Sequence, residues 1–157
     1  MIICDDYLAL RVIVAGRPAS IPTNEHLAMT PSTWWRLLRP AHTILDTRSQ
    51  GTAPEITGVF SRIFAASSNP QIEAIIDPNP QIIEILDSRP LLSLAASLGT
   101  NNTTPTRRSG SLNGLESLAA AVHHNGALWY GRERNVEPFI ANRAPQLGID
   151  INIIDPT

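Results

Sequence analysis

The sequence predicts an α/β fold: one domain in which a mainly parallel central sheet is flanked by helices on both faces. Short apolar runs, typical of buried strands, alternate along the chain with longer segments whose apolar residues recur at helical spacing. Strands that alternate with helices are joined by crossovers, which makes neighbouring strands parallel and covers both faces of the sheet. The chain has 157 residues and no internal repeat, so residues 1–157 are predicted to form a single domain.

Composition and charge restrict the class of protein. Hydrophobic residues make up 43% and charged residues 17% of the chain, as in soluble globular proteins. The net charge of -2 gives no general attraction to nucleic acid, so any RNA contact needs a local basic patch. The single cysteine, Cys4, leaves no internal disulfide and fits a reducing compartment. Residues 1–16 lack a basic targeting signal and no apolar run reaches about 18 residues, so a cytoplasmic protein without a membrane partner is expected.

The predicted strands are the short apolar runs. Residues 1–4 are apolar throughout and end at Asp5 and Asp6, which indicates a central strand with two acids at its carboxyl end. The full set of predicted strands covers residues 1–4, 26–29, 81–86, 127–130 and 149–154.

The predicted helices begin and end at residues that favour helix termini. Gly16 stops the first helix, and Thr30 followed by Pro31 is a typical helix start, with Pro40 as the expected end of that helix. Residues 99–110 are polar and are expected to form a loop. The predicted helices cover residues 7–15, 34–39, 54–66, 90–98, 115–122 and 137–144, with one further turn within the proline-rich residues 69–80.

The stretch from 115 to 136 combines a helix, a turn, a strand and a loop, and it carries two acids. Gly126 is expected to end the helix in the left-handed conformation, and Gly131 is expected to end the strand that follows. Glu116 then opens the helix and Glu133 follows the strand. Sites in open α/β sheets form outside the carboxyl ends of the strands, so we expect these two acids to share a divalent metal there.

These features resemble the PIN-domain family, which includes metal-dependent ribonucleases and many toxins of bacterial toxin–antitoxin pairs. One part of the resemblance is an opening strand that ends in Asp5 and is followed by an apolar helix. The other part is a C-terminal series in the family's usual order, which here consists of Glu116, the alanines at 119–121, Gly126, the strand at 127–130, Arg132, Glu133 and a last helix and strand.

The resemblance implies a ribonuclease in which Asp5, Glu116 and Glu133 are catalytic. With Asp6 beside Asp5, the same acids would hold Mg²⁺ or Mn²⁺. Oxygen ligands suit these ions, and a bound ion activates water and stabilises charge on a phosphoryl group. The family also implies a cognate antitoxin as partner, RNA as substrate and a homodimer.

One position departs from the family pattern, because Arg36 stands where the second acid is expected. A cation there would repel a metal ion and neutralise the remaining acids, unless Glu25 or Glu55 reaches the site instead. A second interpretation therefore stays open, in which a catalytically degenerate PIN-like protein binds protein or RNA.

Each charged residue also has a simpler explanation. The pair of acids after the first strand could be a solvated turn, Glu116 could favour the helix dipole, and Glu133 could be an exposed loop charge. The arginines that could contact an RNA backbone are Arg36, Arg107, Arg108, Arg132 and Arg134.

Overall fold

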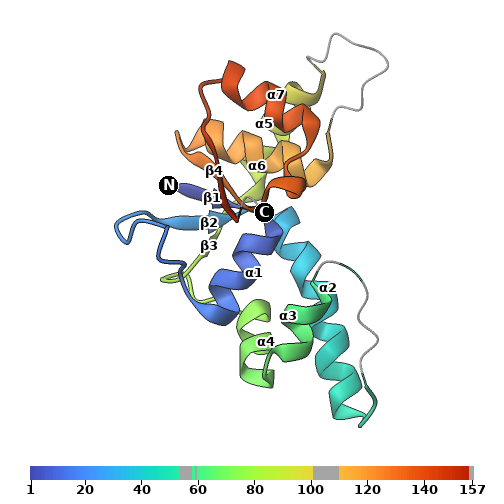
Figure 1. Cartoon of the computed structure of the whole chain (residues 1–157). Helices are drawn as coiled ribbons and strands as arrows, with labels where there is room; N and C mark the ends of the chain where they lie inside the picture. Colours follow the sequence, from blue (N-terminus) through green and yellow to red (C-terminus); the bar gives the residue numbers. More distant parts are fainter. Residues whose placement is uncertain (54–57, 59, 101–109, 156–157) are drawn as a thin grey trace.

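The computed structural model describes residues 1–53, 58, 60–100 and 110–155. They form a five-stranded sheet in the order β3-β2-β1-β4-β5, in which every pair of neighbouring strands is parallel (Figure 1). The predicted α/β fold with a parallel sheet flanked by helices is therefore confirmed. The strands are β1 (Ile2–Cys4), β2 (Leu27–Met29), β3 (Glu84–Ile85), β4 (Ala127–Arg132) and β5 (Ile151–Asp155).

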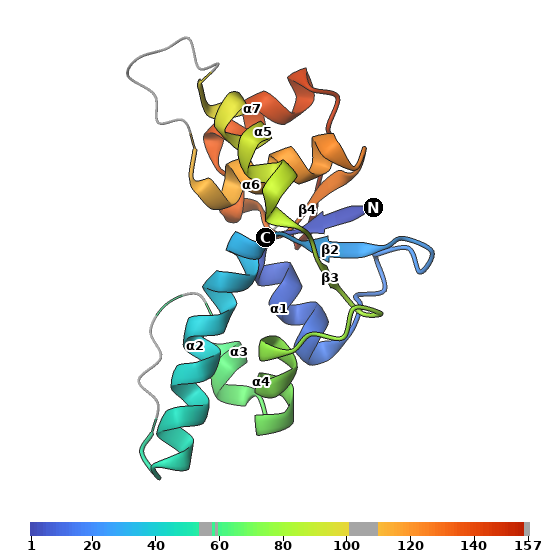
Figure 2. The ribbon, with the colours of Figure 1, turned by 180° about the vertical axis from the view of Figure 1, so that it is seen from behind.

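Helices cover both faces of this sheet (Figures 1 and 2). One face packs against α1 (Asp6–Ala15), α2 (Pro31–Ser49), α3 (Ser61–Ala66) and α4 (Asn69–Ile76). The other face packs against α5 (Ser88–Thr100), α6 (Leu112–His123) and α7 (Pro138–Gln146). A short 3₁₀ helix, η1 (Glu133–Asn135), joins β4 to α7.

Alternation along β1 explains why the two faces have separate cores. Ile2 and Cys4 belong to the core on the α1–α4 side, whereas Ile3 belongs to the core on the α5–α7 side. Successive side chains of a strand point to opposite faces, so a strand that is apolar throughout is buried on both. β1 is therefore the central strand that its composition predicts.

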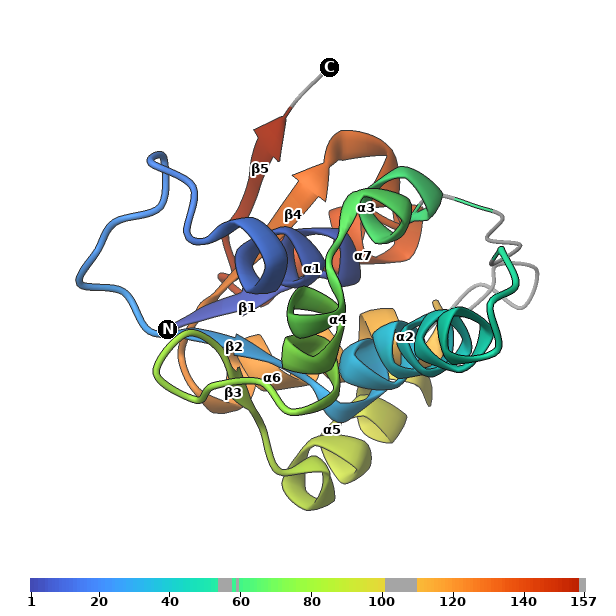
Figure 3. The ribbon, with the colours of Figure 1, turned by 90° about the horizontal axis from the view of Figure 1, so that it is seen from below.

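The strands fan out from near the N-terminus toward their carboxyl ends, which all lie on one side of the parallel sheet (Figure 3). β1 pairs with β4 from Ile2 to Cys4, and the backbone N–H of Asp5 still donates to the carbonyl of Trp129 at 3.0 Å. This pairing brings the first residues after β1 beside the end of β4, at the edge where a site is expected.

The prediction that Pro40 ends the second helix is wrong, because α2 continues through it to Ser49. A proline inside a helix removes one backbone hydrogen bond and costs about 3 kcal/mol. On both sides of this position α2 buries residues of its inner face, which are Leu37, Ala41 and Ile44. Burial of a large aliphatic side chain contributes roughly 1.5–3 kcal/mol, so the inner face outweighs the proline.

Two glycines act differently from the prediction. Asn125, with φ of 50°, takes the left-handed conformation after α6 that was expected of Gly126. Gly126 is instead required by space, because a Cβ atom there would lie 2.6 Å from the carbonyl oxygen of Met1. Gly131 does not end the strand either, since β4 runs on to Arg132.

The remaining boundaries differ by a few residues. α4 forms two turns where one was expected, and β3 covers two residues of the predicted strand at 81–86. The predicted helix over 54–66 is described only as α3, and residues 54–57, 59 and 101–109 lie outside the described part of the chain. None of the helices in the described part is both long and apolar enough to cross a membrane.

Candidate functional site

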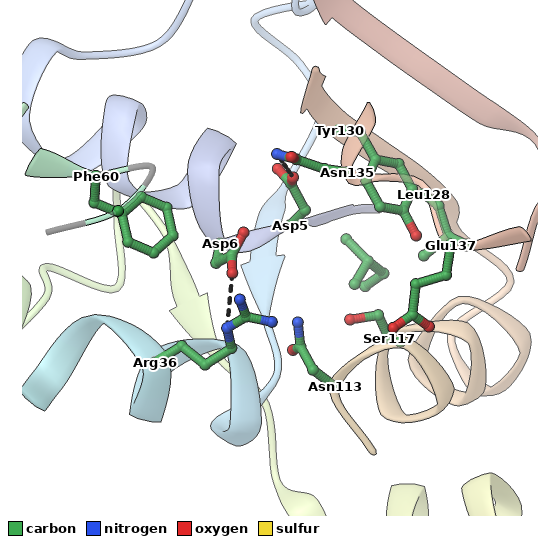
Figure 4. Close-up of a pocket in the computed structure, with 13 residues that line it drawn as sticks. Asp5, Asp6, Arg36, Phe60, Asn113, Ser117, Leu128, Tyr130, Asn135 and Glu137 are labelled. Carbon is green, nitrogen blue, oxygen red and sulfur yellow. Dashed lines mark hydrogen bonds and ion pairs between the residues drawn. The ribbon is translucent and has the colours of Figure 1, made fainter. Parts of the chain in front are cut away.

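A cavity of about 350 Å³ lies at the carboxyl edge of the sheet, between β1, β4, α2, α6 and the turn into α7 (Figure 4). Its acidic side chains are Asp5, Asp6 and Glu137. Its other polar side chains are Arg36, Asn113, Ser117, Tyr130 and Asn135. Small-molecule sites in proteins begin at roughly 300 Å³, so this cavity is large enough for a small polar ligand.

Asp5 caps α1 and is held by three neutral donors. Its Oδ1 accepts the backbone N–H groups of Leu8 at 2.8 Å and Gly131 at 3.0 Å, and its Oδ2 accepts the amide of Asn135 at 3.1 Å. The residue is 8% exposed, and burial raises the pKa of Asp5 to about 6 although these hydrogen bonds oppose the shift.

Asp6 is equally buried but has a cation beside it. The Nε of Arg36 lies 2.9 Å from its Oδ2, and the Arg36 side chain is 52% exposed. Burial raises the pKa of Asp6 and the positive charge of Arg36 opposes that rise. Arg36 therefore pairs with one of the two acids that follow β1.

Helix α6 supplies amide and hydroxyl groups to the cavity. The residues of α6 that line it are Asn113, Gly114 and Ser117, which share one face of the helix. The Oδ1 of Asn113 accepts hydrogen bonds from the hydroxyls of Thr33 at 2.7 Å and Ser32 at 3.3 Å, which fixes α6 to the start of α2.

Glu137 brings a third carboxylate to the cavity from the turn before α7. Both of its oxygens accept the backbone N–H of Ser111, at 3.3 and 3.2 Å, where the positive end of the α6 dipole stabilises a negative charge. A Cβ atom on Gly114 would lie only 2.3 Å from Oε2 of Glu137. Glycine at this position thus leaves the space that the carboxylate occupies.

The acids also affect Tyr130, which lines the same cavity and is 6% exposed. Burial and the negative charges of Asp5, Glu137 and Asp6 raise the pKa of its hydroxyl, which stays protonated at neutral pH. Tyr130 therefore presents a donor to the cavity.

The structure places the predicted site residues in different environments. Asp5, Asp6 and Arg36 line the cavity, whereas Glu116 and Glu133 do not. Glu116 is 2% exposed on α6, and its Oε1 has no hydrogen-bond partner in the part of the chain that is described. Glu133 is exposed in η1.

The predicted RNA-binding arginines are also dispersed. Arg132 packs over the ring of Tyr7, with 4.2 Å from its Cζ to the ring centroid, and donates to the Tyr7 hydroxyl at 2.6 Å. Arg134 is exposed in η1. Arg107 and Arg108 lie outside the described residues.

The donor set does not fit the predicted Mg²⁺ or Mn²⁺ centre. Within residues 1–53, 58, 60–100 and 110–155, no three His, Cys, Asp or Glu side chains lie close enough together to hold a metal ion. One carboxylate of the cavity is paired with a guanidinium, and the side chains that α6 and η1 contribute include the amides Asn113 and Asn135. A guanidinium repels a cation and offers it no lone pair, and the Oδ1 of Asn113 already accepts hydrogen bonds from Ser32 and Thr33, so few oxygens are left for a hard cation.

Several residues of the cavity have no signal in the sequence. Asn113, Ser117, Tyr130 and Glu137 carry no motif, and they come together only through the packing of α6 and α7 on the sheet. Asn135 lies two residues after Glu133, in the same short 3₁₀ helix. For the other residues the nearest local signal is Gly114, in the first turn of α6. Glycine destabilises a helix interior, so its presence there indicates a packing requirement.

Comparison of the chain with protein-family models, with curated proteins and with solved structures finds no match.

Proposed function

We propose that this chain is a PIN-like domain that binds single-stranded RNA at the cavity and does not hydrolyse it through a metal ion. The observation that carries the proposal is the replacement of carboxylates by other groups around Asp5 and Asp6. Arg36 pairs with Asp6, and the amide of Asn135 donates to Asp5. A hydrolytic metal centre needs several ionised oxygen ligands, whereas a binding site uses amides and guanidinium groups directly.

RNA is the ligand class that the surroundings favour. Arg36 uses Nε for Asp6, and its terminal nitrogens make no further contact with described residues, so they are free for a phosphate. Arg134 is exposed on the neighbouring turn. The cavity itself combines hydrogen-bond donors and acceptors with the aromatic ring of Phe60, as sites for unpaired bases do.

The test is RNA binding measured by fluorescence anisotropy, with and without EDTA, beside a cleavage assay in Mg²⁺ and in Mn²⁺. We expect equal binding in EDTA and Mg²⁺ and no cleavage. Arg36→Gln should weaken binding roughly three- to tenfold by removing one phosphate contact. Arg39→Gln is the matched control, since Arg39 is exposed on the same helix but does not line the cavity. Absence of RNA binding, or equal loss in both variants, rejects the proposal.

A metal-dependent ribonuclease, with an antitoxin as partner, is the second candidate. It is favoured by the fact that Asp5, Asp6 and Glu137 all line one cavity, although the three carboxylates are not grouped closely enough in this structure to hold a metal ion together. Mn²⁺-dependent RNA cleavage that is lost in Asp5→Asn and in Glu137→Gln would establish it in place of the first. Cleavage lost in Glu116→Gln and Glu133→Gln instead would support the acids predicted from the sequence. Inactivity of the wild-type protein in both metals leaves the binding function.

A further inference from the structure

The outer side of β5, at one edge of the sheet, has no neighbouring strand among the described residues. The backbone N–H of Leu128 in β4 donates to the carbonyl of Asp150 at 2.9 Å. Because alternate residues of a strand bond to the same neighbour, the N–H and carbonyl groups of Ile151 and Ile153 point away from β4. No residue in the described ranges bonds to these groups. In Figure 3, β5 borders the sheet, and none of the helices and strands drawn there lies beyond it on that side.

The two edges of the sheet differ in how well they resist pairing with another chain. β3, at the opposite edge, has only two residues, and a short edge strand is a common protection against such pairing. β5 has five residues, with no proline and with no charged side chain before its last residue. An edge of this kind is a ready template for a further strand.

The sequence of β5 matches itself when two copies run antiparallel. With Asn152 opposite Asn152 of the other copy, Ile151 of each copy lies opposite Ile153 of the other. Each such pair then exchanges its outward N–H and carbonyl groups as a hydrogen-bonded pair. The two isoleucines already pack against the core on the α5–α7 side, so their side chains would extend one apolar surface across the contact. Asp150 lies opposite Ile154, so no carboxylate directly faces another in this register.

We propose that β5 pairs antiparallel with β5 of a second copy of this chain, about a twofold axis at Asn152, so that two five-stranded sheets form one continuous sheet. A second copy is the occupant that the segment itself specifies, since β5 supplies both the outward backbone groups and the side chains that match them. The contact closes after two copies, because the same strand serves on both sides of the axis. No residue of β5 lines the cavity, so the inference does not depend on the RNA-binding proposal.

The oligomeric state of the full chain is measured by analytical ultracentrifugation over a range of concentrations, and we expect a dimer that dissociates on dilution. Amide hydrogen exchange followed by NMR reports on the contact itself. The N–H groups of Ile151 and Ile153 should exchange roughly tenfold or more slowly in the dimer than after dilution. The N–H of Leu128, which bonds within the sheet, should be protected at both concentrations and is the internal control.

Charge at the axis tests the register. Asn152→Lys and Asn152→Glu should each weaken the dimer roughly fivefold or more, because residues directly opposite lie about 5 Å apart and like charges would face each other. An equimolar mixture of the two variants should restore the dimer, since opposite charges then meet at the axis. Asn79→Lys, in an exposed turn before β3 at the opposite edge, should dimerise like the wild type.

Ile153→Pro tests the hydrogen bonds and keeps the inference testable if the variants at Asn152 fail to fold. It removes an outward N–H from each copy and leaves the ladder between β4 and β5 in place, so the dimer should weaken roughly tenfold. A wild-type protein that is monomeric at every concentration overturns the inference. So does a dimer that neither Asn152→Lys nor Ile153→Pro weakens, or one that forms without protecting the N–H groups of Ile151 and Ile153.

Discussion

Asp5 and Asp6 are neighbours in the sequence and equally buried, yet the structure stabilises them by different means. Asp5 is surrounded by neutral donors from Leu8, Gly131 and Asn135, and Asp6 has a cation. The pKa of Asp5 rises to about 6 because dipoles compensate incompletely for lost hydration. One carboxyl group of the cavity therefore changes its charge near neutral pH, while the other depends on an ion pair.

The largest expected effect comes from Gly131→Ala, which disrupts the environment of Asp5. A Cβ atom there would lie 2.3 Å from Cδ1 of Tyr7 and 3.3 Å from the backbone nitrogen of Leu8, so β4 and α1 must separate. We expect the free energy of unfolding to fall by about 3 kcal/mol, the upper part of the range for overpacking. Chemical denaturation measures it.

Gly148→Ala serves as the control for that experiment. Gly148 has φ of 72°, and a Cβ atom added there would have no other atom within 4 Å, so its substitution adds backbone strain without a steric clash. It should cost about 1 kcal/mol. Equal losses in the two variants would show that close approach of β4 to α1 is not what requires glycine at position 131.

Asp5→Asn should stabilise the protein above pH 7. The folded pKa of about 6 lies above the usual value of 3.8, so the folded state binds more protons between these values and stability falls as pH rises through 6. Asparagine is as good a helix cap as aspartate and carries no charge, but its Nδ2 would face the donating amide of Asn135, which offsets part of the gain. We expect a gain of about 2 kcal/mol at pH 8, somewhat less than the roughly 3 kcal/mol of the full shift.

Denaturation of Asp5→Asn and wild type between pH 4 and pH 8 measures this difference. The difference in the free energy of unfolding should be close to zero near pH 4, where the carboxyl group of folded Asp5 is protonated and that of unfolded Asp5 is about half protonated. It should reach its full size above pH 7. Asp77→Asn, at an exposed position outside the cavity, is the matched control. A difference that does not grow with pH would contradict the burial effect on Asp5.

Arg36→Gln tests the ion pair of Asp6, and we expect it to change the free energy of unfolding less than Asp5→Asn does. Half of the Arg36 side chain is exposed, so solvent screens the pair and its loss should cost only about 1 kcal/mol at pH 7. The cost should shrink toward pH 4, as the raised pKa of Asp6 lets its carboxyl group take up a proton. A double-mutant cycle with Asp6→Asn gives the coupling energy.

The same cycle with Asp5→Asn in place of Asp6→Asn is the control. A smaller coupling is expected there, because Arg36 contacts the second carboxylate and not the first. If both cycles give the same coupling, Arg36 acts as a general charge of the cavity and the distinction between the two acids is lost.

The parallel sheet and the position of Asp5 and Asp6 at its carboxyl edge could be predicted from the sequence, since apolar runs and helical spacing are local patterns. Which face of α6 lines the cavity could not be predicted. All residues of α6 from Gly114 to Ala121 are buried, so the helix has no continuous exposed side that would distinguish the face at the cavity from the face at the core. Charge alone therefore points to Glu116, while Asn113 and Ser117 line the cavity.

Pro40 and Glu137 are two further cases in which local sequence patterns do not predict the structure. A helix continues through Pro40 because of side chains that it buries against other elements, which local propensity does not include. Glu137 reaches the cavity because it lies over the start of α6, where Gly114 makes space. Contacts between residues far apart in the sequence decide both cases.

Asn135→Ala is expected to have the smallest effect on stability. It separates the influence of neutral hydrogen-bond donors on the pKa of Asp5 from the influence of burial. It removes the amide that donates to Oδ2 of Asp5 at 3.1 Å, so the ionised carboxylate loses one of its three donors. The pKa of Asp5 should then rise above about 6, and stability at pH 8 should fall by about 0.5–1 kcal/mol. NMR titration of the Asp5 carboxyl carbon measures the pKa, and Asn79→Ala, in an exposed turn, is the control. An unchanged or lower pKa would mean that the amide does not support the charged form, and that burial and the two backbone N–H groups alone determine how Asp5 differs from Asp6.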